Sequence, residues 1–341
     1  MVKLQSLKKL KKRLKNSYKC FWGGLYKVDK KIATREAYGK VLVEIGETNK
    51  DVVVLDADLS KSTKTYEFSR KFPERFFNMG VAEANMIATA AGLATTGKVP
   101  FCSTFAVFAT GRAFDQIRNS VAYPKLNVKI AATHAGITVG EDGGSHQSIE
   151  DIALIKALPG FTIFVPADAV ETRKAVNAAL EIDGPVYIRL GRLAVPVIHD
   201  DDVEFIPGKA LKLRDGGDVA IIATGLMVSL ALEAADILLK DNIKATVLDV
   251  HTIKPLDVET IVAVATQTGA VVTAEEHNII GGLGSAVAET LSEHNPVPLK
   301  RVGIRDVFGE SGKPAELLKH FGLTAKEIVN AVYNVLKKKS Q

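Results

Sequence analysis

The chain has 341 residues, of which 47% are hydrophobic and 24% are charged, a composition that excludes a largely disordered protein. Its net charge of +5 is unevenly spread: residues 1–31 hold 11 basic residues and one acidic residue, which leaves 33 basic and 38 acidic residues in residues 32–341. Two cysteines, Cys20 and Cys102, exclude a disulfide framework and fit a reduced, cytoplasmic compartment.

Residues 1–31 are predicted to be a basic, disordered N-terminal extension. An amphipathic surface helix or a nucleic-acid-binding patch is the alternative for so basic a segment. The apolar stretch CFWGGLY within it is too short and too rich in glycine for a signal-peptide core or a membrane span. We therefore expect neither a nucleic-acid partner nor a membrane.

From residue 32 onward, short β-branched segments alternate with helix-like segments such as ATREAYGKVLVEIGETN and AEANMIATAAGLATTG. This alternation predicts a parallel sheet that is covered by helices on both faces. The strands of this first domain, residues 32–195, are expected at 52–58, 75–80, 99–105, 127–134, 161–168 and 186–191.

Residues 196–210 contain two prolines and an acidic run, and are predicted to form a linker. A second alternating set follows and forms a second α/β domain, residues 211–341. Its strands are expected at 218–225, 245–251, 270–277 and 298–304.

The polar residues of the first domain collect where predicted strands end, which is the edge at which parallel α/β sheets bind ligands. Taken singly, each has a structural interpretation: an acid in the first turn of a helix, a pair of core phenylalanines, a buried histidine or a surface arginine. Together they predict a site for a polar, phosphorylated ligand. The residues are Asp58, Ser62, Glu83, Phe105, Phe108, His134, Arg189 and Arg192.

The segment GEDGGSHQ, residues 140–147, follows the strand that ends at His134. It places Asp142 and His146 on a glycine-rich loop, in a position where α/β enzymes bind ligands, which indicates a functional loop. The sequence has no Gly-x-Gly-x-x-Gly, no P-loop, no HExxH and no Gly-x-Ser-x-Gly, which argues against a nicotinamide dehydrogenase and several other enzyme classes.

Several segments resemble the pyrimidine-binding domain of transketolases: NMGVAEANMIATAAGLA, CSTFAVFATGRAFDQIRN, THAGITVGEDGGSHQ and GPVYIRLGR. The part after residue 205 resembles the transketolase C-terminal domain, in VLDVHTIKPLD and EEHNIIGGLGSAVAE. The resemblance covers roughly residues 32–335. It implies ketol transfer between a ketose phosphate and an aldose phosphate, with thiamine diphosphate and a divalent metal such as Mg²⁺.

For the cofactor, the resemblance implies that Glu83 faces the pyrimidine ring nitrogen and favours the tautomer that removes the thiazolium proton. Phe108 matches the family position that stacks on the pyrimidine, and Phe105 lies beside it. His146 matches a residue that contacts the donor sugar near its reacting carbonyl, and we count it with Glu83 as catalytic.

For the sugar, the resemblance implies that Asp142 accepts from a hydroxyl, that His146 contacts the donor, and that Gly143 and Gly144 let the loop close around the substrate. The implied phosphate-binding residues are Arg35, Ser62, His134 and Arg192.

The chain departs from the family pattern at two points. Gly111 stands where many transketolases carry a third aromatic residue in the cofactor pocket. The diphosphate and metal motif, Gly-Asp-Gly followed by a distant Asn, is not in the sequence, so no metal ligand is expected on this chain. We therefore expect a separate N-terminal subunit to carry that motif, and a heterotetramer that contains a dimer of this chain.

The sequence leaves three alternative functions open. A subunit of a deoxyxylulose-5-phosphate synthase shares STF, AGI and HQ with this chain, and a 2-oxo acid dehydrogenase beta subunit shares its length and domain order. His134, Asp142 and His146 favour a phosphosugar over an acyl group. A catalytically inactive binding or regulatory relative is the alternative from a different class.

Overall fold

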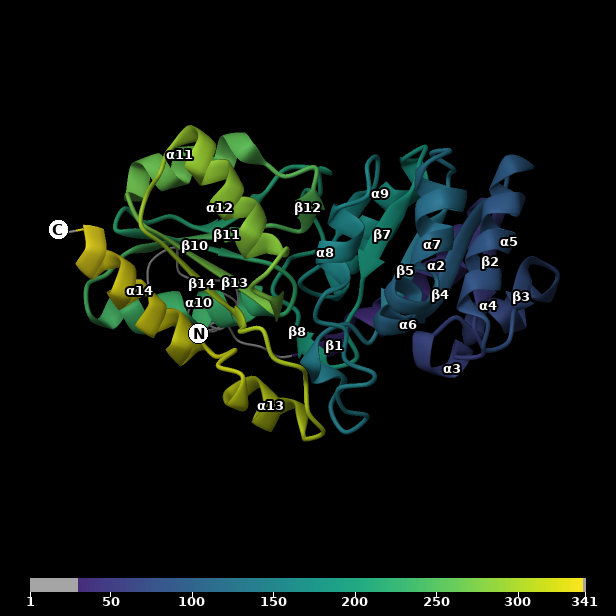
Figure 1. Ribbon diagram of the computed structural model, residues 1–341, viewed down its shortest axis with the longest axis horizontal. Helices are drawn as coiled ribbons and strands as arrows, with labels where there is room; N and C mark the ends of the chain where they lie inside the picture. Colours follow the sequence, from purple (N-terminus) through teal and green to yellow (C-terminus); the bar gives the residue numbers. More distant parts are fainter. Residues whose placement is uncertain (1–29, 340–341) are drawn as a thin grey trace, which may run out of the picture.

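The computed structural model describes residues 30–339, and its backbone forms two β-sheets side by side along the long axis of the molecule (Figure 1). The first sheet has seven strands, six of them purple to teal in Figure 1 and one green, and the second sheet, green to yellow, has five. The predicted α/β fold with two parallel-dominated sheets is confirmed. Nearly all of the predicted basic extension, residues 1–29, lies outside the described residues.

Six strands of the first sheet run parallel in the order β6-β7-β5-β4-β2-β3. They are nearly continuous apolar segments because both faces are covered: Val52 and Val54 pack on one side, and Val53 and Leu55 pack on the other. The strands are β2 (Val52–Asp56), β3 (Phe76–Asn78), β4 (Val99–Phe105), β5 (Lys129–Thr133), β6 (Thr162–Phe164) and β7 (Val186–Arg189).

One face of this sheet is covered by α2 (Thr34–Thr48), α4 (Tyr66–Lys71) and α9 (Ala169–Glu181), and the opposite face by α5, α6 and α8. Asp168 begins α9 by accepting a hydrogen bond from the Glu171 amide at 2.9 Å. The remaining helical segments are α3 (Ser60–Thr63), η1 (Pro73–Arg75), α5 (Glu83–Thr95), α6 (Ala106–Arg112), α7 (Phe114–Gln116), η2 (Ile117–Ala122), η3 (Ile137–Val139) and α8 (Asp151–Lys156).

The second sheet has the order β14-β13-β10-β11-β9, parallel except for its edge strand β9. The strands are β9 (Leu211–Arg214), β10 (Val219–Ala223), β11 (Ala245–Asp249), β13 (Val271–Asn278) and β14 (Leu299–Ile304). The helices are α10 (Met227–Lys240), α11 (Val258–Thr268), α12 (Leu283–His294), α13 (Pro314–His320) and α14 (Ala325–Lys339).

The two sheets are joined more closely than a linker alone would allow. Strand β12 (Thr252–Lys254), which follows β11 of the second sheet, pairs antiparallel with β6 at the edge of the first sheet. A single apolar cluster then runs from α5 in the first part of the chain to α11 and α12 in the second. A two-stranded pair of β1 (Lys31–Ala33) and β8 (Ala194–Pro196) lies where the first part ends. No helix within residues 30–339 is both long and apolar enough to cross a bilayer.

Candidate functional site

The predicted site residues of the first sheet lie at one edge, after the ends of β2, β3, β4, β5 and β7. Phe105 closes β4 and is in register with Thr133, the last residue of β5, so that His134 follows directly beside it. Glu83 begins α5, which comes after β3, and Arg35 lies in the first turn of α2. The carboxyl ends of parallel strands therefore bring together residues about 100 positions apart in sequence.

Four aromatic rings form the centre of this edge. Phe105 stacks on His134 with ring centroids 3.7 Å apart, and on Phe108 at 5.6 Å with nearly parallel planes. His146, from the glycine-rich loop, meets Phe108 edge-to-face at 5.3 Å. Phe105 is buried and Phe108 is half-buried, so Phe108 has the more accessible ring of the two.

Glu83 is 3% exposed and contacts a residue that the sequence pattern did not single out, Arg112. Arg112 Nη1 donates to Glu83 Oε1 at 2.9 Å, and its guanidinium carbon lies 3.9 Å from the centroid of the Phe108 ring. One flat, hydrogen-bonding group thus covers the Phe108 ring and contacts the Glu83 carboxylate at the same time. The neighbouring Gly111 is exposed, and a Cβ atom there would meet no heavy atom within 4 Å.

His134 is 2% exposed and is held at both ring nitrogens. Nδ1 lies 2.9 Å from the Thr133 hydroxyl, and Nε2 lies 3.0 Å from Arg35 Nη1, which also donates to the Ser62 carbonyl at 2.9 Å. The backbone of His134 has φ +57°, a conformation that a non-glycine residue adopts at a cost and that is enriched at functional sites. Arg35, Ser62 and His134 therefore form one contact group, through the carbonyl of Ser62 and not through its hydroxyl.

Burial lowers the pKa of His134 to about 3, and the nearby charges of Arg35 and Arg192 act in the same direction. We expect this imidazole to remain neutral at pH 5 in the isolated chain, as measured by NMR of its ring nitrogens. The unfolded chain takes up this proton near pH 6.5 and the folded chain only near pH 3, so acidification across that range favours unfolding.

In an Arg35→Gln variant the pKa of His134 should rise, because a cation 3.0 Å away is removed. Arg70→Gln, which removes an arginine from α4, is the matched control and should leave the titration unchanged. A charged His134 at pH 5 in the unmodified chain would contradict the buried geometry.

Arg192 connects the glycine-rich loop to the same edge. Its Nη1 donates to the Val139 carbonyl and lies 3.5 Å from Glu141 Oε2 and 3.9 Å from Asp142 Oδ2. Asp142 is exposed, with 44% of its side chain accessible. Its carboxylate is thus available to a ligand while the Arg192 contacts hold the loop against the sheet edge.

The two loop glycines pack against the second domain. Their backbone packs against residues 309–312 of the second domain, so a Cβ at Gly143 would lie 2.4 Å from Ser311 Oγ and one at Gly144 would lie 2.6 Å from the Gly309 carbonyl. Gln147 also donates to the Glu310 carbonyl, at 2.8 Å. These contacts between the domains hold the loop in place, and the predicted closure around a sugar stays a prediction. Figure 1 shows the yellow segment before α13 descending beside this teal loop.

Arg189, one of the arginines at the predicted edge, makes buried hydrogen bonds within the protein. It is 7% exposed, its Nε donates to Asp151 Oδ2 at 2.8 Å, and its Nη2 donates to the Glu276 carbonyl at 2.9 Å. Tyr187 donates to the same Asp151 oxygen. Burial raises the pKa of Glu276 to about 7, and its carboxylate accepts from the Thr138 amide at 2.7 Å. Arg189 thus stabilises the contact between the two domains.

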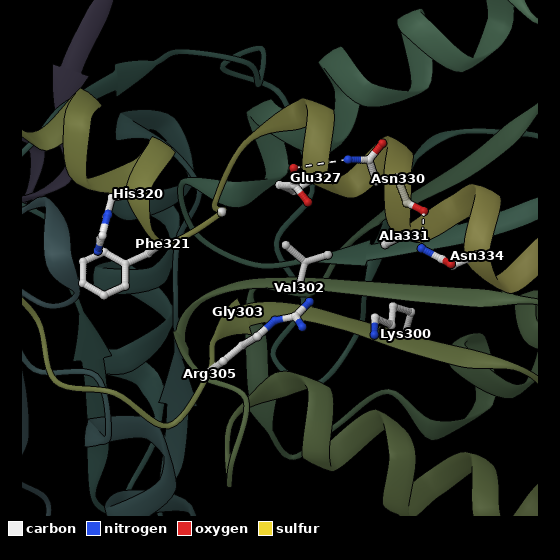
Figure 2. Close-up of a pocket in the computed structure, with 11 residues that line it drawn as sticks. Lys300, Val302, Gly303, Arg305, His320, Phe321, Glu327, Asn330, Ala331 and Asn334 are labelled. Carbon is white, nitrogen blue, oxygen red and sulfur yellow. Dashed lines mark hydrogen bonds between the residues drawn. The ribbon is translucent and has the colours of Figure 1, made fainter.

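A separate cavity of about 380 Å³ lies on the second domain, between β14 and α14 (Figure 2). Its lining includes Lys300, Arg305, His320, Glu327 and Asn330. None of the predicted site residues lines it, so it is distinct from the sheet edge described above.

The sequence matches two protein-family models, which together cover most of the chain. Residues 30–197 match the transketolase pyrimidine-binding domain, and residues 208–328 match the transketolase C-terminal domain. A solved structure described as a split gene transketolase, an inactive beta4 tetramer, is 59% identical with a TM-score of 0.84; the match covers 91% of this chain and 100% of that one.

Two relatives whose length is similar to that of this chain are named as transketolase subunits. The 6-deoxy-6-sulfo-D-fructose transketolase subunit SqwH of Clostridium sp. (strain MSTE9) is 49% identical over 306 residues, or 90% of this chain and 95% of that protein. A subunit of the apulose-4-phosphate transketolase of Phocaeicola vulgatus is 40% identical over 308 residues, or 90% of this chain and 98% of that protein.

Proposed function

The chain belongs to the transketolase family, as the C-terminal section of an enzyme split over two subunits, and we propose that it transfers a two-carbon ketol unit from a ketose phosphate to an aldose phosphate, as in the pentose phosphate pathway. The observation that carries this proposal is that the Glu83 carboxylate and the Phe108 ring share one partner, Arg112, at the edge that also holds Arg35 and His134. The relatives favour this function over a deoxyxylulose-5-phosphate synthase or a 2-oxo acid dehydrogenase, because both named enzymes are transketolases.

A transketolase pyrimidine-binding domain implies thiamine diphosphate, and the residues at this edge fit its aminopyrimidine ring. The guanidinium of Arg112 already shows that a flat group can lie on Phe108 and contact Glu83 together. When bound, the cofactor supplies the carbanion chemistry of ketol transfer. Phe105 stacks on the Phe108 ring, and Glu83 holds a proton at the pyrimidine nitrogen from a carboxylate that burial separates from bulk water.

For the sugar, we propose that Arg35, Ser62, His134 and Arg192 surround its anionic end. Arg35 and Arg192 supply the positive charge, and a guanidinium matches the oxygens of a phosphate better than an ammonium group does. Asp142 accepts from a sugar hydroxyl, and His146, beside Phe108, contacts the donor near its reacting carbonyl. His134, being neutral, contributes a hydrogen bond and not a charge.

The names of the two relatives extend the range of donor sugars that the assay should test. One is named for a sulfonated sugar and the other for a sugar phosphate, and both of these substrates carry an anionic group. We keep sugar phosphates as the substrates because two arginines and a histidine at one edge suit a dianion. A strong preference for the sulfonated donor would narrow the proposal to that anion without removing ketol transfer.

We further propose that the N-terminal subunit supplies the diphosphate and Mg²⁺ ligands through a Gly-Asp-Gly…Asn motif, and that two copies of each subunit assemble as a heterotetramer. The solved relative is named a split gene transketolase and an inactive beta4 tetramer, and its self-association supports an assembly that holds more than one copy of this chain. We also retain 32–195, 196–210 and 211–341 as the domain boundaries of the proposal.

The decisive experiment measures ketol transfer from xylulose 5-phosphate to ribose 5-phosphate with thiamine diphosphate and Mg²⁺. The chain is assayed alone and together with the candidate N-terminal subunit. Both samples are then assayed again with 6-deoxy-6-sulfofructose or apulose 4-phosphate in place of xylulose 5-phosphate as the donor. Activity only in the mixture supports the proposal. Activity of the chain alone contradicts a site divided between two subunits. If no donor gives activity, a catalytically inactive binding or regulatory relative is the better explanation.

Arg112 should compete with the cofactor, because both use Glu83 and Phe108. In an Arg112→Gln variant of the reconstituted enzyme we expect thiamine diphosphate to bind about fivefold more tightly, the effect of a partly exposed ion pair worth about 1 kcal/mol. Isothermal titration calorimetry measures this directly. Arg118→Gln, an exposed arginine of η2, is the control. Weaker binding in Arg112→Gln would show instead that the guanidinium supports the bound cofactor.

A further inference from the structure

A cluster of buried acidic residues lies at the junction of the two domains, away from the candidate site. Asp168 begins α9, Glu171 is in the first turn of that helix, and Asp249 ends β11 of the second sheet. His199, from the segment that joins the domains, lies among them. All three carboxylates have no accessible surface, and His199 is 6% exposed.

His199 is oriented by one of the three carboxylates. Its Nδ1 lies 3.1 Å from Asp168 Oδ2, an oxygen that also accepts from the backbone amides of Ile198 and His199. This leaves Nε2 facing Asp249 and Glu171. An imidazole whose Nδ1–H is held by a carboxylate, with Nε2 directed at further acids, is the arrangement that metal-binding histidines adopt.

The atoms around Nε2 lack the partners that buried polar groups require. Glu171 Oε1, both oxygens of Asp249 and Nε2 itself have no hydrogen-bond partner within residues 30–339. Nε2 does lie 3.2 Å from Asp249 Oδ2, but without the alignment of a hydrogen bond. Buried, unpartnered oxygens of this kind are rare in folded proteins and call for an unseen ligand or proton.

Charge points to a cation. One histidine, even when doubly protonated, balances only one of three buried carboxylates, and burying an unbalanced carboxylate is costly. Glu171, His199 and Asp249 each offer one possible ligand atom, and these three atoms all lie within 4.8 Å of one another. Ligands of a tetrahedral zinc ion are roughly 3.5 Å apart, so small side-chain movements would close the site.

We propose that Glu171, His199 and Asp249 bind a divalent transition-metal ion, with zinc as the best match, and that Asp168 positions the histidine. Imidazole and carboxylate ligands in a set of three suit zinc, and a fourth position is left for water. The ion would connect α9, the joining segment and β11, and so fasten the two domains together. This site lies away from the candidate site and is independent of the metal expected with thiamine diphosphate.

The test uses the full, untagged chain without its partner subunit, so that the proposed Mg²⁺ ligands are absent. Elemental analysis after growth with zinc and dialysis without chelator should give close to one zinc per chain. Anomalous diffraction at the zinc edge should place the ion between the three side chains of the unmodified protein. Chelation should lower the melting temperature, and added Zn²⁺ should restore it.

Variants separate this site from adventitious binding. Asp249→Asn and His199→Gln should lose the zinc, and Asp168→Asn should weaken it by about 10- to 100-fold, as for other residues that orient a metal-bound histidine. His320→Gln is the control, because it removes an exposed histidine that also lies near a carboxylate, Glu310. Substoichiometric zinc, no anomalous peak and a melting temperature indifferent to chelator and Zn²⁺ would overturn the proposal and leave Glu171 and Asp249 sharing a proton.

Discussion

Glu83→Gln is expected to lower ketol transfer by the reconstituted enzyme by about 10²- to 10⁴-fold, the range for loss of a group that transfers protons. Glutamine keeps the size of the side chain and can still contact Arg112, but it cannot hold a proton at the pyrimidine nitrogen. Because Glu83 is 3% exposed, water is poorly placed to replace it. The rate of deuterium exchange at the thiazolium carbon should fall in parallel, since it reports proton removal without a sugar.

The matched control is Glu67→Gln, which changes an exposed glutamate in the first turn of another helix, α4. It should retain activity and exchange. Thiamine diphosphate affinity should change by only a few fold in Glu83→Gln, because stacking on Phe108 persists. Unchanged exchange with lost activity would move the role of Glu83 from proton transfer to substrate binding.

Asp151→Asn is expected to destabilise the chain by about 3–5 kcal/mol, the cost of leaving a buried cation without its partner. Asp151 has no accessible surface, and one of its oxygens accepts from both Arg189 and Tyr187 at 2.8 Å. Asparagine can keep an oxygen toward both donors, but it removes the negative charge that balances the buried Arg189 guanidinium. Urea denaturation of the isolated chain measures the change in free energy of unfolding.

The control for this variant is Asp51→Asn, which breaks an ion pair with Lys98 of nearly equal length, 2.9 Å, at the surface. With side chains 60% and 39% exposed, that pair should be worth less than about 1 kcal/mol. Equal losses in the two variants would show that burial does not set the strength of the Asp151 pair.

The sheets could be predicted from the sequence because each strand is a short apolar segment between turn residues. Val52 to Asp56 and Val219 to Ala223 have this pattern, and both are central strands. The edge that gathers Phe105 and His134 follows from the same reasoning, since parallel strands end together. The family resemblance then named the residues, but their roles at the site still depend on the experiments above.

What the sequence could not supply are contacts between distant segments. Arg112 contacts Glu83, which is 29 positions away in the sequence. No sequence pattern around an arginine in a helix indicates which buried acid on another helix it contacts. Gln147 contacts Glu310 across 163 positions, and the packing of Gly143 and Gly144 against residues 309–312 is equally distant in sequence. Strand β12 is only three residues long, too short for any periodicity to show.

Strand β12 has a consequence for motion. Because it belongs by sequence to the second domain and by hydrogen bonds to the first sheet, hinge bending between the domains would have to break a sheet and open a shared apolar cluster. The two parts should therefore move as one rigid body. Residues 140–147 and 309–312 would then keep their mutual contact when a partner subunit binds, and we expect assembly to be the docking of a preorganised surface.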